Sequence, residues 1–160
     1  NKRFVPQNIY MPGRKRLPGT MWVCWDSSGS CCGRHELESF RDNIVVNCSR
    51  MGIDRVLISY VDGVLNMNPA TDKPWFEHRT SRGSAANKLD LVPFGGGGTS
   101  FDPIFDYVKD SGEYVKGLIY LTDGYGRVNA PKPDFPVLWA TTRVAPTFVN
   151  QGQWGEIVYI

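Results

Sequence analysis

The sequence lacks the features of a membrane-spanning or exported chain. Its 160 residues contain no apolar run near the roughly 18 residues that a membrane-spanning helix needs, and residues 1–7 lack the apolar segment of a secretory signal. An excess of one charge is also missing, since 18 Lys and Arg oppose 16 Asp and Glu. With 41% hydrophobic residues, the composition excludes collagen-like and disordered chains and indicates a folded globular domain.

The net charge of +2 is unevenly distributed along the chain. Five basic residues and no acidic residue precede Asp26, so the remainder carries −3. Pro and Gly recur in the first 20 residues, as in extended segments. We therefore expect residues 1–20 to form an extended basic arm or linker from a missing N-terminal region, and residues 21–160 to form one domain. The basic excess lies in a tail, so we expect neither nucleic acid nor a membrane as partner.

Histidine is scarce, with two residues, and the motifs of common enzymes are missing. His35 and Glu36 are not followed by the second His of a His-Glu-x-x-His zinc motif. No glycine stands two residues before Ser28, as a Gly-x-Ser-x-Gly nucleophile turn requires. Walker A and dinucleotide-binding glycine patterns are also missing. Known peptidase, triad and nucleotide-dependent chemistry is therefore not expected within these residues.

Cysteine is limited to four residues. Cys24 and Cys48 lie on apolar stretches, which is typical of reduced core thiols and predicts a cytoplasmic location. A soft-metal site made of Cys31, Cys32 and His35 is a minor alternative, because no second Cys or His pair stands at zinc-finger spacing.

Apolar patterns predict alternating strands and helices. We expect a helix after Gly33 that ends at Gly52, and a second helix that begins after a hydroxyl cap at Thr99 and Ser100. An Asp-Gly turn at 62–63 predicts an antiparallel edge strand at residues 64–65, and residues 66–88 are irregular. Strands are expected at residues 21–26, 55–61, 117–122, 136–141 and 156–160, with short ones at 75–78 and 89–92.

This alternation predicts an α/β fold. The expected architecture is a doubly wound, mostly parallel, Rossmann-like sheet with an antiparallel edge strand and helices on both faces. In such a sheet the ligand crevice lies at the carboxyl edge, where strand order reverses. Asp26 and Asp123 both stand where a buried strand reaches that edge.

Three polar segments are expected to meet at this edge. Asp26, Ser28 and Ser30 follow the first strand, Thr99 follows four glycines, and Asp123 ends the strand at 117–122. Two neighbouring carboxylates require a proton or a cation between them, and a set of oxygen donors alone favours Mg²⁺, with Mn²⁺ or Ca²⁺ as alternatives. Cys31 stands against this oxygen-only set if its side chain points inward.

The pattern Asp26-x-Ser28-x-Ser30 with remote Thr99 and Asp123 resembles the metal-ion-dependent adhesion site (MIDAS) of von Willebrand factor A (VWA) domains. More narrowly, several stretches resemble the VWA-like domain at the C-terminal end of metallopeptidase-like bacterial and phage proteins. These stretches are residues 9–13, 95–99, 118–126 and 136–139. The resemblance covers nearly all of residues 21–160.

The resemblance implies roles for these residues. Ser28 and Ser30 would bind the metal directly, Thr99 directly or through water, and Asp26 and Asp123 largely through water. One exchangeable position would then accept an Asp or Glu of a protein partner. Tyr125, Ser27 and Ser100 are the expected rim that contacts the partner. Ser100 stands where the family often has an acidic residue, and we expect Asp102 to take over its role.

Two functions from different classes follow. The first is a divalent-metal-dependent protein-binding module, acting as the recruiting or regulatory domain of a larger metallopeptidase-like protein. The alternative is a hydrolase or metal-dependent enzyme domain that uses the same carboxylates and hydroxyls.

Overall fold

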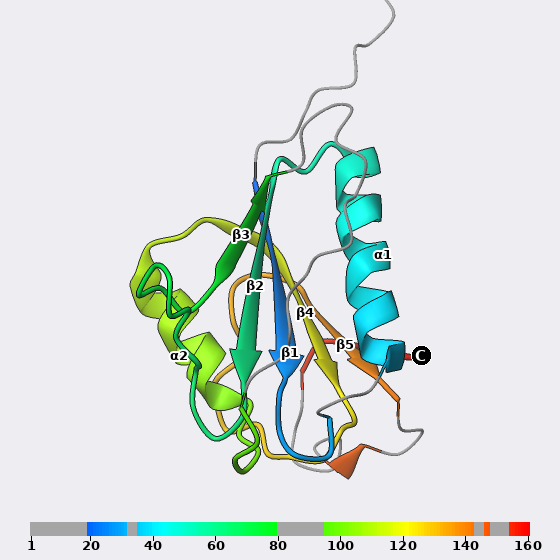
Figure 1. Ribbon diagram of the computed structural model, residues 1–160, viewed down its shortest axis with the longest axis vertical. Coiled ribbons are helices and arrows are strands. Elements are labelled where there is room, and N and C mark those ends of the chain that lie inside the picture. Colours follow the sequence, from blue (N-terminus) through cyan, green and yellow to red (C-terminus); the bar gives the residue numbers. More distant parts are fainter. Residues whose placement is uncertain (1–18, 32–34, 80–94, 143–145, 148–153) are drawn as a thin grey trace, which may run out of the picture.

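The structure is a computed structural model that describes residues 19–31, 35–79, 95–142, 146–147 and 154–160. The predicted arm at residues 1–18 and the predicted strand at 89–92 lie outside these ranges. Figure 1 shows the elements in the order β1 (Thr20–Asp26), α1 (His35–Met51), β2 (Arg55–Val61), β3 (Phe76–Arg79), α2 (Asp102–Ser111), β4 (Val115–Thr122), β5 (Val137–Thr141) and β6 (Glu156–Tyr159).

The strands form one six-stranded sheet in the order β3-β2-β1-β4-β5-β6. Every neighbouring pair is parallel except β2 and β3, which are antiparallel. The predicted α/β class, with a mostly parallel sheet and an antiparallel edge, is therefore confirmed. The three central strands are buried almost throughout, as their continuous apolar runs predict for strands covered on both faces.

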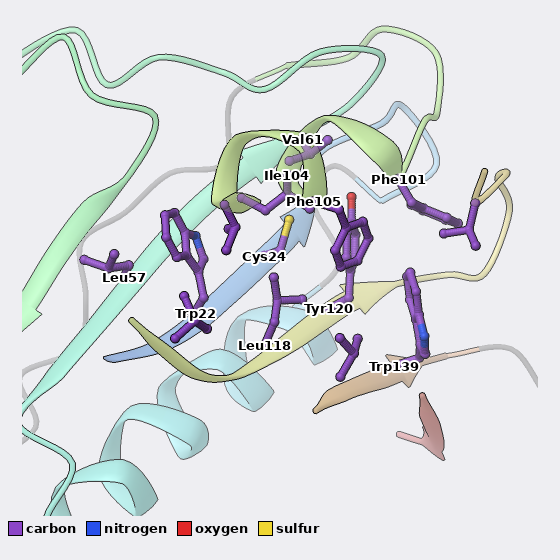
Figure 2. Close-up of a cluster of buried hydrophobic side chains, with 14 of the residues drawn as sticks. Trp22, Cys24, Leu57, Val61, Phe101, Ile104, Phe105, Leu118, Tyr120 and Trp139 are labelled. Carbon is purple, nitrogen blue, oxygen red and sulfur yellow. The ribbon is translucent and has the colours of Figure 1, made fainter. Parts of the chain in front are cut away.

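Alternation along β1 divides the interior into two cores. Trp22 and Cys24 point to one face of the sheet, and Val23 and Trp25 point to the other. Figure 2 shows the first core, where Ile104 and Phe105 of α2 pack over β1, β4 and β5. The second core lies under α1, through its buried residues Leu37, Ile44, Val45 and Cys48. The two helices of the described chain therefore cover opposite faces.

The antiparallel edge strand differs from the prediction at residues 64–65. The chain does turn at Asp62 and Gly63, but Val61 and Leu65 form only an isolated bridge. The edge strand is instead β3, in which Phe76 pairs with Ile58 of β2. Its position matches the short strand expected at 75–78. The hydroxyl of Ser59 in β2 holds the segment that leads into β3 by donating a hydrogen bond to the Pro74 carbonyl at 2.5 Å.

The start of α2 also differs from the prediction. Phe101 occupies the cap position, and no side chain caps the helix there. The ring of Phe101 is fully buried against Tyr120 and Trp139, with ring centroids 5.1 and 5.5 Å away. Tertiary packing of this ring therefore decides where the helix begins. Asp102 accepts hydrogen bonds from the backbone N–H groups of Asn129 and Ala130, so it anchors the loop after β4.

The order of the strands positions the site. Strand β1 lies between β2 and β4, and the connections that leave β1 and β4 run in opposite directions across the sheet. The arrowheads of β1, β2 and β4 all point to the same edge (Figure 1). Asp26 ends β1 and Asp123 directly follows β4, so both lie at the carboxyl edge where strand order reverses, as predicted.

In the described ranges, no helix combines the length and apolar character needed to cross a membrane.

Trp139 is the residue whose loss we expect to damage the fold most. It is fully buried, stacks on Tyr120 with ring centroids 5.0 Å apart, and donates a hydrogen bond to the Trp154 carbonyl at 2.8 Å. Trp139→Ala is expected to lower the free energy of unfolding by about 3–5 kcal/mol, measured by urea denaturation. Tyr114, whose side chain is 75% exposed, provides the control, and Tyr114→Ala should cost less than about 0.5 kcal/mol. Equal losses in the two variants would contradict this assignment of the core.

Candidate metal centre

Asp26 lies at the centre of the candidate site. It is fully buried, and each carboxylate oxygen has a partner. Oδ1 accepts the backbone N–H of Ser28 at 3.0 Å, and Oδ2 accepts the hydroxyl of Thr122 at 2.6 Å. The second bond joins the ends of β1 and β4, which come from distant parts of the sequence.

The burial of Asp26 raises the pKa of its carboxyl group above the ordinary value. Hydrogen bonds from Ser28 and Thr122 lower the pKa and oppose this effect, while the negative charge of Asp123 raises it further. None of these influences on Asp26 comes from a cationic side chain of the described residues. Negative charge therefore accumulates at this edge, and a proton or a bound cation would stabilise it.

Asp123 approaches Asp26 from β4. Its side chain is 3% exposed, and its Oδ1 accepts the backbone N–H of Tyr125 at 3.0 Å. The chain turns sharply at Gly124, where φ is +83° and an added Cβ would lie 2.5 Å from Pro146 Cβ. Thr122 supports the same turn, because its hydroxyl oxygen accepts the Gly124 N–H at 3.0 Å while it donates to Asp26.

The two predicted serine ligands lie side by side. The hydroxyl oxygens of Ser28 and Ser30 are 3.4 Å apart. Ser28 is buried, whereas Ser30 is exposed, so the pair extends from the interior to the surface. The N–H of Cys31 donates to the Ser28 carbonyl at 2.9 Å and closes a turn around them.

This turn directs Cys31 into the site. Its side chain is fully buried, and one ligand atom each of Asp26, Cys31 and Asp123 lies within 4.8 Å of the others. The donor set therefore differs from the predicted oxygen-only set. Burial and, to a smaller extent, the charges of the two aspartates raise the pKa of Cys31 to about 12, so the thiol is protonated unless a cation offsets their charge.

The glycine loop lies beside these groups. A Cβ at Gly95 would lie 2.5 Å from Ser27 Oγ, and one at Gly29 would lie 4.0 Å from the Gly96 carbonyl oxygen. Thr99 is half-buried and packs against the loop after β4, since a Cβ at Gly126 would come within 2.8 Å of its Cγ2. The structure thus brings the aspartates together, pairs the serine hydroxyls, and places Thr99 beside Gly126, three residues after Asp123.

Asp62 has a role that the sequence did not reveal. It does turn the chain after β2, as its Oδ1 accepts the Val64 N–H at 3.0 Å. In addition, Oδ2 accepts the Gly97 N–H at 3.1 Å, and its backbone carbonyl accepts the Ser100 N–H at 2.9 Å. Asp62 therefore anchors the glycine loop. The sequence signal for this role is that Asp62 directly follows β2 and therefore lies at the same sheet edge as Asp26 and Asp123.

Of the three residues expected to contact a partner at the rim of the site, Ser27 does not fit. Ser27 is fully buried, and its hydroxyl oxygen accepts a hydrogen bond from the Asn66 side chain at 3.3 Å, so its side chain does not lie on the surface. Tyr125 is 49% exposed and follows the site directly. Ser100 is half-buried.

The alternative soft-metal group of Cys31, Cys32 and His35 does not assemble in the described residues. The side chain of His35 is 92% exposed and contacts Glu38, whereas Cys31 is buried. Cys32 lies outside the described ranges. Cys24 and Cys48 are free and buried, as predicted for core thiols.

Gly95 and Gly98 offer a matched test of how tightly the glycine loop packs. Gly95 has φ +148° and would bring a Cβ within 3.0 Å of Asp62 Oδ2, whereas nothing lies within 4 Å of a Cβ at Gly98. Gly95→Ala is therefore expected to destabilise the protein by about 1–3 kcal/mol, and Gly98→Ala to stay within about 1 kcal/mol of wild type, measured by thermal unfolding. Similar losses in both variants would show that the loop is not held in this way.

The chain was compared with protein-family models, curated proteins and solved structures, and no match was found in any of the three comparisons.

Proposed function

We propose that this domain is a divalent-metal-dependent protein-binding module with a MIDAS-type site. The observation that carries the proposal is the convergence of two buried aspartates from neighbouring parallel strands with a pair of serine hydroxyls at the point where strand order reverses. Mutual repulsion opposes such an arrangement of carboxylates, and a divalent cation would relieve it.

The strand order and the antiparallel edge support a VWA-like, doubly wound assignment. The strand order β3-β2-β1-β4-β5-β6 is that of a Rossmann-type sheet, and β3 is its antiparallel edge strand. The connections after β4 and β5 contain no helix in their described portions, so strands and helices do not alternate through the whole sheet. In this proposal the domain recruits or regulates as part of a larger metallopeptidase-like chain.

The oxygen donors of the site fit a hard divalent ion such as Mg²⁺, with Mn²⁺ or Ca²⁺ as alternatives. The hydroxyls of Ser28, Ser30 and Thr99 would hold it. Both oxygens of Asp26 already accept protein hydrogen bonds, which favours contact with the ion through water rather than directly. Asp123 would act in the same way.

The bound ion would supply an electrostatic attraction for one carboxylate of a protein partner. Neutral hydroxyl ligands leave most of the ion's charge available for this contact. Ser30 is exposed and Tyr125 is half-exposed beside the site, so both would lie on the face that a partner covers. Aromatic residues with a polar end are frequent at the centre of such interfaces.

The hydrolase alternative has less support. A serine nucleophile needs a base within hydrogen-bond reach, and Ser28 instead pairs with the hydroxyl of Ser30. His35 is exposed on α1 and contacts Glu38. His78 lies on the edge strand β3, where it pairs with Val56.

Metal-dependent stability tests the site itself. Saturating Mg²⁺ at one hundred times Kd should stabilise the wild-type protein by about 2.7 kcal/mol, a rise in Tm of about 5–10 °C for a chain of this size. Asp26→Asn keeps the side-chain size, removes the charge and should abolish the rise. The rise is measured from each protein's own Tm in EDTA, because the amide of the variant cannot accept both hydrogen bonds that Asp26 accepts and this changes the starting stability.

Asp106, an exposed acid on α2, is the matched control, and Asp106→Asn should keep the full response to Mg²⁺. Equal Mg²⁺ responses in wild type and Asp26→Asn would exclude the proposed site.

Partner binding is tested separately from metal binding. Immobilised protein should retain a partner with Mg²⁺ and release it with EDTA. Tyr125→Ala should weaken retention by about tenfold or more, as expected for an aromatic contact worth above about 1.4 kcal/mol, while the Mg²⁺-dependent rise in Tm persists. Tyr114→Ala removes another exposed aromatic residue and should have no effect. Retention that is indifferent to EDTA would argue against a metal-bridged contact.

A further inference from the structure

Cys31 is a buried side chain of the candidate centre with a ligand atom that the proposed function does not use. Its sulfur lies within 4.8 Å of a carboxylate oxygen of Asp26 and of Asp123. Ligand atoms bound to one ion lie about 2.0–2.3 Å from it and hence no more than about 4.6 Å apart. A small adjustment would therefore allow the sulfur and one oxygen of each aspartate to reach a single cation directly, in place of the water-mediated carboxylate contacts proposed for a hard ion.

The surroundings of Cys31 differ from those of an ordinary core cysteine. Its sulfur lies beside the carboxylates of Asp26 and Asp123, and its backbone N–H donates to the Ser28 carbonyl at 2.9 Å. Cys48, by contrast, lies on the apolar face of α1 among hydrophobic residues. Cys31 touches the second hydrophobic core on one side and the polar site on the other, so its sulfur is directed between the ends of β1 and β4.

Three independent elements bring these donors together. Asp26 comes from β1, Asp123 follows β4, and Cys31 comes from the turn that the Ser28 carbonyl closes. A group of two carboxylates, a thiol and two hydroxyls is a mixed oxygen and sulfur set. Mg²⁺ takes oxygen ligands, whereas thiolate ligands favour Zn²⁺ and chemically similar ions such as Co²⁺.

We propose that Cys31 is a thiolate ligand of the metal centre and that the centre therefore binds Zn²⁺ or a similar borderline ion as well as hard ions. This inference rests on the proposed function, because it assigns one more ligand to the same centre. When the ion binds, the sulfur–metal bond forms and the thiol proton passes to solvent. Hard ions would use the oxygen donors and leave the thiol protonated.

Co²⁺ provides the direct probe, since a cobalt–thiolate bond produces a near-ultraviolet charge-transfer absorption that oxygen ligands do not. Wild-type protein in a non-thiol reductant should develop this band when Co²⁺ is added. Cys31→Ser should lack the band, and Cys48→Ser should keep it. Cys31→Ser should also lose at least about tenfold in Zn²⁺ affinity, because removal of a ligand costs no less than removal of a group that supports one.

The response of Cys31→Ser to Mg²⁺ separates the failure of this inference from the failure of the proposed function. A Mg²⁺-dependent rise in Tm in that variant would show that it folds and keeps the oxygen site, and Cys31→Ala provides a second substitution with the same expectation. Co²⁺ binding without the band, or a band that survives in Cys31→Ser, would overturn the thiolate ligand and leave the proposed function intact. No stabilisation of the wild-type protein by Mg²⁺, Co²⁺ or Zn²⁺ would overturn both.

Discussion

The hydrogen bond from the Thr122 hydroxyl to Asp26 is the contact on which the arrangement at the sheet edge depends. It spans 2.6 Å between buried atoms and joins the last residues of β1 and β4. Because these strands are parallel neighbours, their carboxyl ends meet at one edge, and each is followed by a loop that turns away from the sheet. The bond keeps a buried carboxylate in place next to Asp123, at a position where repulsion between the two charges opposes it.

The rest of the fold supports this edge from two sides. Bulky aromatic residues fill the core under α2, with Tyr120 and Trp139 stacked on neighbouring strands and Phe101 against both. This packing begins α2 directly after the glycine loop, so the loop is held by Asp62 at Gly97 and by the buried Phe101 ring that follows it. A rigid core thus positions loops whose own sequences are rich in Gly and Ser.

The sequence predicted the features that depend on periodicity and chain order. Apolar runs predicted β1 and β4 as buried strands, and the alternation of strands and helices predicted that Asp26 and Asp123 share an edge. Local patterns could not predict contacts made between distant segments. The inward direction of Cys31 depends on the turn closed by the Ser28 carbonyl, and the burial of Ser27 depends on Asn66. The prediction of an edge strand at residues 64–65 is wrong because Asp62-Gly63 signals a turn but not how far along the chain the next strand begins.

The central claim is that the carboxylates and hydroxyls at this edge bind one divalent ion. Anomalous diffraction from crystals grown with Mn²⁺ tests it most directly, since the ion's position is located without reference to any assumed ligand. The account predicts one strong anomalous peak among Asp26, Ser28, Ser30, Thr99 and Asp123. Well-ordered crystals with no peak there, or with Mn²⁺ bound only elsewhere on the molecule, would contradict it.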